Sequence, residues 1–210
     1  MIKRSILLAV AVLLLASPAF AKKNKTITKT DSTITDTKYG WNMNYTENWK
    51  VKDFKEPSME RLYMIKKNYS VNQNLRTYGG DYTIPTFTLF IKEFDGTIDD
   101  FEAMLKKNLV EHRSDDKLIN KLGLARDSEF IVSGEVTIDS TVAKQIYVKR
   151  NYKRVLDVRG KIQYINDHEV HEIYLMKVNN LIYVIQGFCE REFFETNTLE
   201  FRAMIESFRL

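Results

Sequence analysis

Cysteine, proline and glycine are all scarce in this sequence of 210 residues. A single cysteine, Cys189, excludes an internal disulfide framework and a cysteine-rich zinc module. Three prolines and eight glycines exclude collagen-like and other low-complexity architectures. Hydrophobic residues form 44% of the chain and aromatic residues 12%, which is enough for a packed core. We therefore predict a globular protein in which Cys189, at the end of an apolar run, is buried and inert.

The sequence also lacks the common catalytic and nucleotide-binding motifs. It has no Gly-x-Ser-x-Gly elbow, phosphate-binding loop, dinucleotide fingerprint or EF-hand loop. Ser114 and Lys117 have the Ser-x-x-Lys spacing of penicillin-interacting enzymes, but the Lys-Thr-Gly motif that accompanies it there is missing. We therefore predict that the protein is not an enzyme and has neither catalytic residues nor a cofactor.

The first 21 residues have the pattern of a secretory signal peptide. A short basic start precedes an apolar run from Ser5 to Ala16, and Ala19-Phe20-Ala21 provides a cleavage pattern. A retained membrane anchor is the alternative, but the run is shorter than the roughly 20 residues that span a bilayer as a helix. We expect cleavage after Ala21, a periplasmic or secreted location, and no membrane span in the mature chain.

The charge of the mature chain is nearly balanced. The sequence has 32 basic and 28 acidic residues, and removal of Lys3 and Arg4 with the signal peptide leaves 30 against 28. Basic residues cluster at positions 22–25 and 149–154, but neither cluster belongs to a nucleic-acid-binding motif. We therefore predict no nucleic-acid partner.

Hydrophobic patterning predicts one α+β domain over residues 38–210, preceded by a flexible polar segment at 22–37. Strands are predicted within 39–54, on both sides of a turn at 46–48, and at 60–67, 86–94, 129–138, 142–152, 155–165, 172–178 and 181–188. Short polar turns at Asp139-Ser140 and Asn179-Asn180 favour antiparallel hairpins. The run at 181–185 is apolar on both faces, which places that strand at the centre of the sheet.

Two helices complete this prediction. Thr97 and Asp100 form a capping arrangement before an apolar stripe that runs to about His112. A second helix is predicted near 197–207, with Asn197 and Glu200 as its capping pair and Phe201, Ile205 and Phe208 as its buried stripe. We expect Trp49 and Phe208 to be core residues.

The order of these segments resembles the PsbP/Mog1-like domain family. The likeness begins with Tyr39 to Val51, which is similar to that family's opening aromatic hairpin. It continues through the strand at 87–94, the helix start at 96–101, the hairpin at 138–146, the strand at 180–185 and the chain end at 207–209. The departures are Thr46, where the family usually has proline, and Ser140, where glycine is common.

This resemblance implies an antiparallel sheet flanked by helices, an α/β/α sandwich, in a family of mostly non-catalytic proteins. It transfers a fold and no site residue, because the matching positions are mainly apolar or turn-forming.

One candidate binding site is a long hairpin loop predicted at 68–83. Aromatic, leucine and arginine side chains often anchor protein contacts, and this segment supplies Tyr69, Leu75, Arg76, Tyr78 and Tyr82. The alternative is an ordinary solvated loop.

His168 and His171 are the candidate metal ligands, with zinc as the expected ion. On a strand, alternation places the two imidazoles on opposite faces, unlike the helical spacing of an H-E-x-x-H site. A turn could still gather them. We predict a polar hairpin end here and no metal site.

Together these patterns predict an exported, non-catalytic accessory or binding module that acts through contacts with an envelope protein. The alternative function is small-molecule or lipid binding in a pocket between sheet and helix. A contiguous internal cavity favours the second function, and a solid core with an exposed aromatic patch favours the first.

Overall fold

A computed structural model describes residues 26–52, 58–69, 83–112, 114–124 and 127–210. The predicted signal peptide lies outside these residues, as do four of the five predicted contact residues: Leu75, Arg76, Tyr78 and Tyr82. Among the described residues, no helix is both long enough and apolar enough to cross a membrane.

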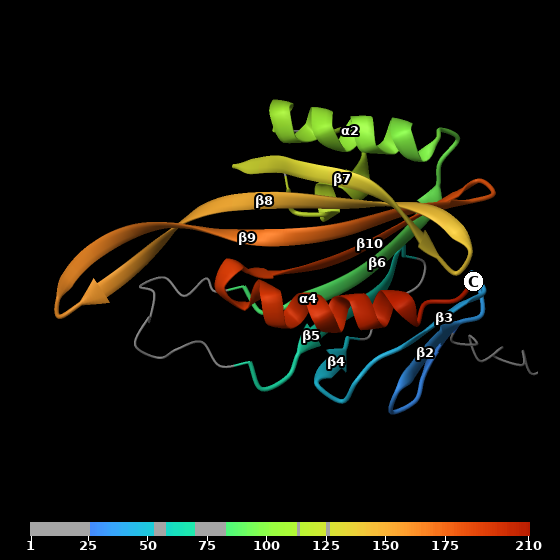
Figure 1. Ribbon diagram of the computed structural model, residues 1–210, viewed down its shortest axis with the longest axis horizontal. Helices are drawn as coiled ribbons and strands as arrows, with labels where there is room; N and C mark the ends of the chain where they lie inside the picture. Colours follow the sequence, from blue (N-terminus) through green and yellow to red (C-terminus); the bar gives the residue numbers. More distant parts are fainter. Residues whose placement is uncertain (1–25, 53–57, 70–82, 113, 125–126) are drawn as a thin grey trace, which may run out of the picture.

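A seven-stranded antiparallel sheet forms the body of the molecule (Figure 1). Its order is β4 (Trp49–Val51), β5 (Glu60–Lys66), β6 (Thr86–Glu93), β10 (Leu181–Glu190), β9 (Lys161–Val178), β8 (Thr141–Val158) and β7 (Ser128–Ile138). The central position of β10, between β6 and β9, confirms the expectation from its apolar run. Side chains from its two faces enter two separate cores, because successive residues of a strand point to opposite sides.

Two-residue turns join the last four strands. The turns at Asp139-Ser140 and Asn179-Asn180 are confirmed. Residues 142–165 fall in two strands as predicted, but the expected break at 153–154 is misplaced, because β8 runs unbroken to Val158 and the turn lies at Arg159-Gly160. Both turn residues have positive φ, 56° and 75°, which is the geometry of a tight hairpin turn with glycine second. The segment 166–171 is consequently part of β9 and not a hairpin end.

A smaller sheet is built from β1 (Ile27–Lys29), β2 (Thr33–Asp36) and β3 (Trp41–Asn44). The expectation of a flexible segment at 22–37 is therefore wrong over residues 27–36. Ile34 and Asp36 both point inward and are fully buried, and Asp36 accepts a 2.7 Å hydrogen bond from Arg61 Nε on β5. The polar composition concealed these strands, since β2 buries only alternate residues.

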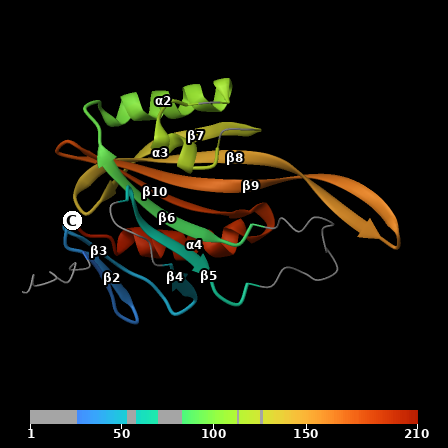
Figure 2. The same cartoon turned by 180° about the vertical axis from the view of Figure 1, so that it is seen from behind.

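Helices cover both faces of the large sheet (Figures 1 and 2). Helices α2 (Ile98–Glu111) and α3 (Lys117–Lys121) contribute to the core on one face, and α4 (Arg191–Glu206) contributes to the core on the other. The capping pair Thr97 and Asp100 is confirmed. The α+β class is confirmed as well, although the sheet dominates and the helix-flanked sandwich is only approximate.

The C-terminal helix differs from its prediction at its start. It begins at Arg191, so Asn197 lies inside the helix and does not cap it. Asn197 and Glu200 instead accept hydrogen bonds of 2.8 Å and 2.7 Å from Lys66 Nζ on β5. The short helix α3 was not predicted from the sequence.

Candidate functional site

The sheet face beneath α4 carries a buried carboxylate that is fully hydrogen-bonded. Glu172 on β9 accepts hydrogen bonds from Gln145, Tyr147 and Tyr174 at Oε1 (2.5, 2.8 and 2.7 Å). Its Oε2 accepts a 2.7 Å hydrogen bond from Thr198 on α4. Burial, then the neighbouring Glu172 carboxylate, raise the pKa of Tyr174, so its hydroxyl stays a donor. This network fastens α4 to the sheet.

The opposite face carries a polar chain of side chains at one end of the sheet. Glu169 Oε2 lies 3.2 Å from Arg150 Nη1 and 3.1 Å from His171 Nε2. His171 Nδ1 lies 2.8 Å from Gln186 Nε2, which also donates to the Leu122 carbonyl at 3.1 Å. Because the Gln186 amide nitrogen is a donor, we assign Nδ1 of His171 as acceptor and Nε2–H as donor to Glu169.

Burial keeps this histidine neutral. His171 is 1% exposed and its ring stacks on Phe188 with centroids 4.9 Å apart. Desolvation by burial lowers the pKa of His171, although Glu169 opposes the shift. Burial alone would raise the pKa of Glu169, but hydrogen bonds from His171 and Thr83 and the charge of Arg150 lower it.

A cavity of about 170 Å³ lies beside this chain, between the sheet and the end of α3. Thr88 on β6 lines it and is 3% exposed. Its hydroxyl has no hydrogen-bond partner among the residues that the structure describes. The cavity is thus a mainly apolar space at the edge of the core, with a few polar side chains on its wall.

The two candidate metal ligands behave differently. His171 faces the polar chain, whereas His168, three residues earlier on β9, lies on the other side of the strand by alternation. Within the described part of the chain, no group of three or more His, Cys, Asp or Glu side chains is placed to hold a metal ion.

Cys189 is buried as predicted, and burial raises the pKa of its thiol to about 12.

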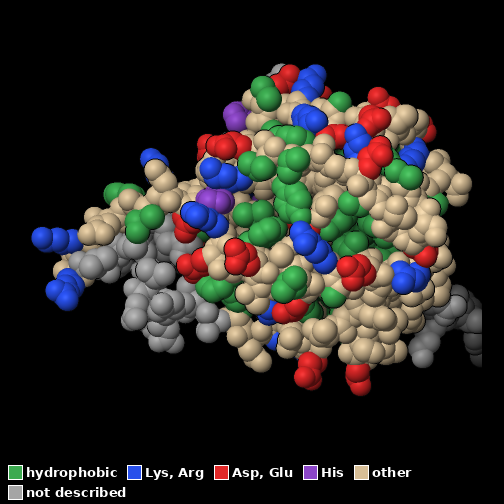
Figure 3. All heavy atoms as spheres, in the orientation of Figure 1, with side chains coloured by type: hydrophobic (Ala, Val, Ile, Leu, Met, Phe, Trp, Pro, Cys, Tyr) green, Lys and Arg blue, Asp and Glu red, His purple; other side chains and the backbone are tan. Residues whose placement is uncertain are grey.

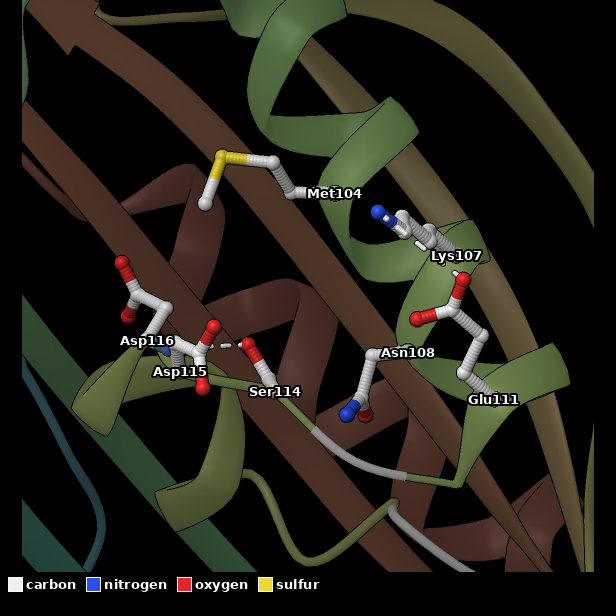
Figure 4. Close-up of a pocket in the computed structure, with 7 residues that line it drawn as sticks. All are labelled: Met104, Lys107, Asn108, Glu111, Ser114, Asp115 and Asp116. Atoms are coloured by element: carbon white, nitrogen blue, oxygen red, sulfur yellow. Dashed lines mark hydrogen bonds and ion pairs between the residues drawn. The ribbon is translucent and has the colours of Figure 1, made fainter.

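A larger cavity, of about 380 Å³, lies between α2 and the segment that leads into α3 (Figure 4). Its lining residues are Met104, Lys107, Asn108, Glu111, Ser114, Asp115 and Asp116. In Figure 4, Asn108 extends from α2 toward the segment that carries Ser114. Asn108 is 1% exposed, and neither its Oδ1 nor its Nδ2 has a hydrogen-bond partner among the described residues.

The charged side chains around this cavity differ in whether they form ion pairs. Asp116 caps α3 through hydrogen bonds to the backbone amides of Leu118 and Ile119, and it forms an ion pair with Lys92. Lys107 and Glu111 form an i, i+4 pair at 3.8 Å on the surface of α2. Asp115 is exposed and has neither a hydrogen bond nor an ion pair within the described ranges.

A β-ribbon projects from the body of the molecule and forms a third candidate surface (Figure 1). Pairing of β8 with β7 ends at Arg150, and pairing of β9 with β10 ends at Glu169. Residues 152–158 and 161–167 pair only with each other within the described chain. We call this ribbon, residues 152–167, the arm.

The arm exposes large apolar side chains next to basic ones. Tyr164 is 71% exposed and Ile162 is 58% exposed, and Ile165 is also largely open to solvent. The arm contains four basic residues and two acidic residues. Figure 3 shows basic side chains at the outer end of the arm and hydrophobic side chains nearer the body.

Of the predicted contact residues, only Tyr69 lies in the described chain. It is half-buried and makes an edge-on contact with Phe193 of α4 at 5.2 Å between ring centroids.

Sequence reasoning did not identify Thr88 or Asn108. The position of Asn108 carried a signal, because it shares the helical stripe of Phe101, Leu105 and Leu109, where a polar residue is unusual.

No family model and no curated protein matches the sequence. Among solved structures, cyanobacterial PsbP (CyanoP) from Synechocystis sp. PCC 6803 is similar, with 15% identity, a TM-score of 0.50, and coverage of 87% of this chain and 95% of that one. The Saccharomyces cerevisiae Ran-binding protein Mog1p aligns at 10% identity and a TM-score of 0.48, covering 87% and 96%. LpqN of Mycobacterium tuberculosis, involved in cell envelope biogenesis, aligns at 10% identity and 0.45, covering 88% of each. The likeness to PsbP confirms the predicted PsbP/Mog1-like fold and shows the fold alone.

Proposed function

We propose that this PsbP/Mog1-like fold is an exported, non-catalytic binding module that acts through protein–protein contacts in the cell envelope. The observation that carries the proposal is the arm. Among the described residues the arm is a two-stranded ribbon, and such a ribbon is marginally stable in water by itself. The arm nevertheless extends about 20–25 Å beyond the sheet, at roughly 3.3 Å per residue, and exposes Tyr164 and Ile162.

Partner binding accounts for this arrangement. Exposed aromatic and apolar side chains are buried at the centres of protein interfaces, and tyrosine is among the residues that dominate binding energy. The excess of basic over acidic residues on the arm favours an acidic partner surface, because complementary charges steer association. Export rests on the signal peptide pattern of residues 1–21, with cleavage after Ala21.

Site-specific photocross-linking in cells tests this function. A photoreactive amino acid replaces Tyr164 on the arm, and in a matched control it replaces Val110, which is 78% exposed on α2. We expect one discrete protein adduct from position 164 and none of that mass from position 110. The double change Arg159→Glu and Lys161→Glu should reduce the adduct about tenfold, as expected when steering charges are reversed. The same adducts from both positions, or none from position 164, would refute the proposal.

A second candidate function is the binding of a small polar molecule between the sheet and α3. The buried hydroxyl of Thr88 in the 170 Å³ cavity favours it. Native mass spectrometry of protein isolated from the envelope should then reveal a bound small molecule. The change Thr88→Val should abolish the added mass while the protein remains folded.

A further inference from the structure

The amide of Asn108 occupies a position where an apolar side chain would be expected. Asn108 lies on the buried stripe of α2, four residues after Met104 and one residue before the core residue Leu109. Buried polar groups in native proteins almost always have hydrogen-bond partners, and an unpaired one destabilises the folded state. Both polar atoms of Asn108 are buried and unpaired among the described residues, and the residue lines the 380 Å³ cavity.

The chemistry of the cavity defines what it would bind. An asparagine side chain offers an acceptor and a donor side by side, and the matching partner is another amide, which offers the same pair in reverse. Met104 adds an apolar wall, and Glu111, Asp115 and Asp116 add negative charge. Asp116 is engaged with Lys92, and Glu111 lies opposite Lys107, which leaves the Asp115 carboxylate for a ligand cation.

We propose that the cavity between α2 and the start of α3 is a binding site for a small cationic amide. The ligand's amide pairs with Asn108, and its ammonium group lies near Asp115. The cavity volume of about 380 Å³ falls within the range of small-molecule sites. The proposal does not depend on the arm, because the cavity lies between α2 and the start of α3, whereas the arm is formed by β8 and β9. The proposed cavity site and the proposed arm interface can therefore fail separately.

Asn197 is a matched control for Asn108. It is a buried asparagine, 2% exposed, on the helix of the opposite face. Its amide is fully engaged, because Nδ2 donates to the Phe193 carbonyl at 2.8 Å and Oδ1 accepts from Lys66. A comparison of the two residues therefore distinguishes a buried amide that stabilises the fold from a buried amide that binds a ligand.

Binding is tested with glycinamide, which carries an amide and an ammonium group. The chain that begins at Lys22 is titrated at millimolar probe concentration and followed by amide chemical shifts. We expect shifts confined to α2 and residues 114–118. Acetamide, without the cation, and ethylamine, without the amide, should each bind at least fivefold more weakly. Tri-alanine tests whether a peptide backbone supplies the same chemistry as a free carboxamide.

Variants then assign the contacts. Asn108→Leu should abolish the shifts from both glycinamide and acetamide, whereas Asp115→Asn, at an exposed position, should weaken glycinamide only. Without probe, Asn108→Leu should raise the melting temperature, and Asn197→Leu should lower it. The proposal is overturned if glycinamide produces no localised shifts. It is also overturned if Asn108→Leu lowers the melting temperature as Asn197→Leu does, because Asn108 would then be a structural amide satisfied by water.

Discussion

The two faces of the large sheet are covered by helices in different ways. Beneath α4, the buried carboxylate of Glu172 receives five hydrogen bonds from three elements, and Trp49 Nε1 donates to Glu200 at 2.7 Å. Beneath α2 and α3, two cavities border Thr88 and Asn108, whose polar atoms are unpaired within the described chain. The α4 face thus has a fully hydrogen-bonded carboxylate at its centre, whereas the other face carries, beside its bonded chain from Glu169 to Gln186, two buried polar side chains without partners among the described residues.

The largest predicted effect is on the α4 face. Trp49 is 1% exposed, and its ring lies 5.7 Å from that of Phe201. Trp49→Ala should lower the free energy of unfolding by about 3–5 kcal/mol, as expected for a truncated buried aromatic residue. Urea denaturation measures the change, with Tyr164→Ala on the arm as control. An equal loss from Tyr164→Ala would mean that the arm is packed core.

A smaller effect compares polar groups on the two faces. Glu172→Ala should cost about 3 kcal/mol, because it leaves buried hydroxyl and amide donors without an acceptor. Thr88→Val removes a hydroxyl that has no partner in the described chain, and it should change stability by less than about 0.5 kcal/mol or increase it. If Thr88→Val costs as much as Glu172→Ala, the contrast between the faces is wrong.

The pH dependence of stability should also originate on the α2 and α3 face. The pKa of His171 is lowered by burial, so below its unfolded value of about 6.5 the unfolded chain binds a proton that the folded chain does not. Stability should therefore fall between about pH 6.5 and 5, by at most about 1.4 kcal/mol per pH unit. Glu169, with its lowered pKa, adds a further loss below its ordinary value of 4.5.

Denaturation of the variants at several pH values checks this prediction. His171→Gln should flatten the dependence between pH 6.5 and 5. The pKa of His168 is lowered too, by partial burial and then by Lys149 and Arg191, so His168→Gln should flatten it less. A larger effect from His168→Gln would contradict the assignment.

The smallest expected effect is that of zinc. His168 and His171 point to opposite sides of β9, so neither face offers both imidazoles to one ion. A ligand that binds only the folded state raises the melting temperature. We therefore expect no measurable shift with equimolar zinc. A shift that disappears in both His168→Ala and His171→Ala would show that the site exists.

The fold could be predicted where local patterns and tertiary packing agree. The alternation of Phe87, Leu89 and Ile91 and the cap at Thr97 identified their elements, because each pattern is local in sequence. The strands at 27–36 were missed because their stability comes from a distant partner, as Arg61 bonds Asp36 25 residues away. The turn at Arg159-Gly160 was missed although its glycine was visible.

The candidate sites depend on which parts of the sheet the helices leave uncovered. The hydrophobic periodicity of a sequence does not indicate where a helix ends relative to the sheet beneath it. Nothing near Thr88 in the sequence indicates that α3 ends at Lys121 and leaves a cavity above β6. Asn197 and Glu200 were predicted to cap a helix, but they lie inside it and bind Lys66 across the fold. The arm was visible only as a basic cluster, because its two-stranded form within the described chain depends on where β7 and β10 end.

The meeting of the two chain ends has a consequence for the order of folding. Asn42 on β3 exchanges backbone hydrogen bonds of 2.9 Å with Arg209, and Asn44 N donates to Ser207 Oγ at 3.0 Å. Contacts across so many residues form late, because the intervening loop must close first. In a chain that crosses a membrane from its N-terminus, β3 would be translocated early. Its contact with Arg209 could form only after residues 207–209 have also been translocated. The bridge between Asn42 and Arg209 would then form after β1, β2 and β3 have already paired with one another.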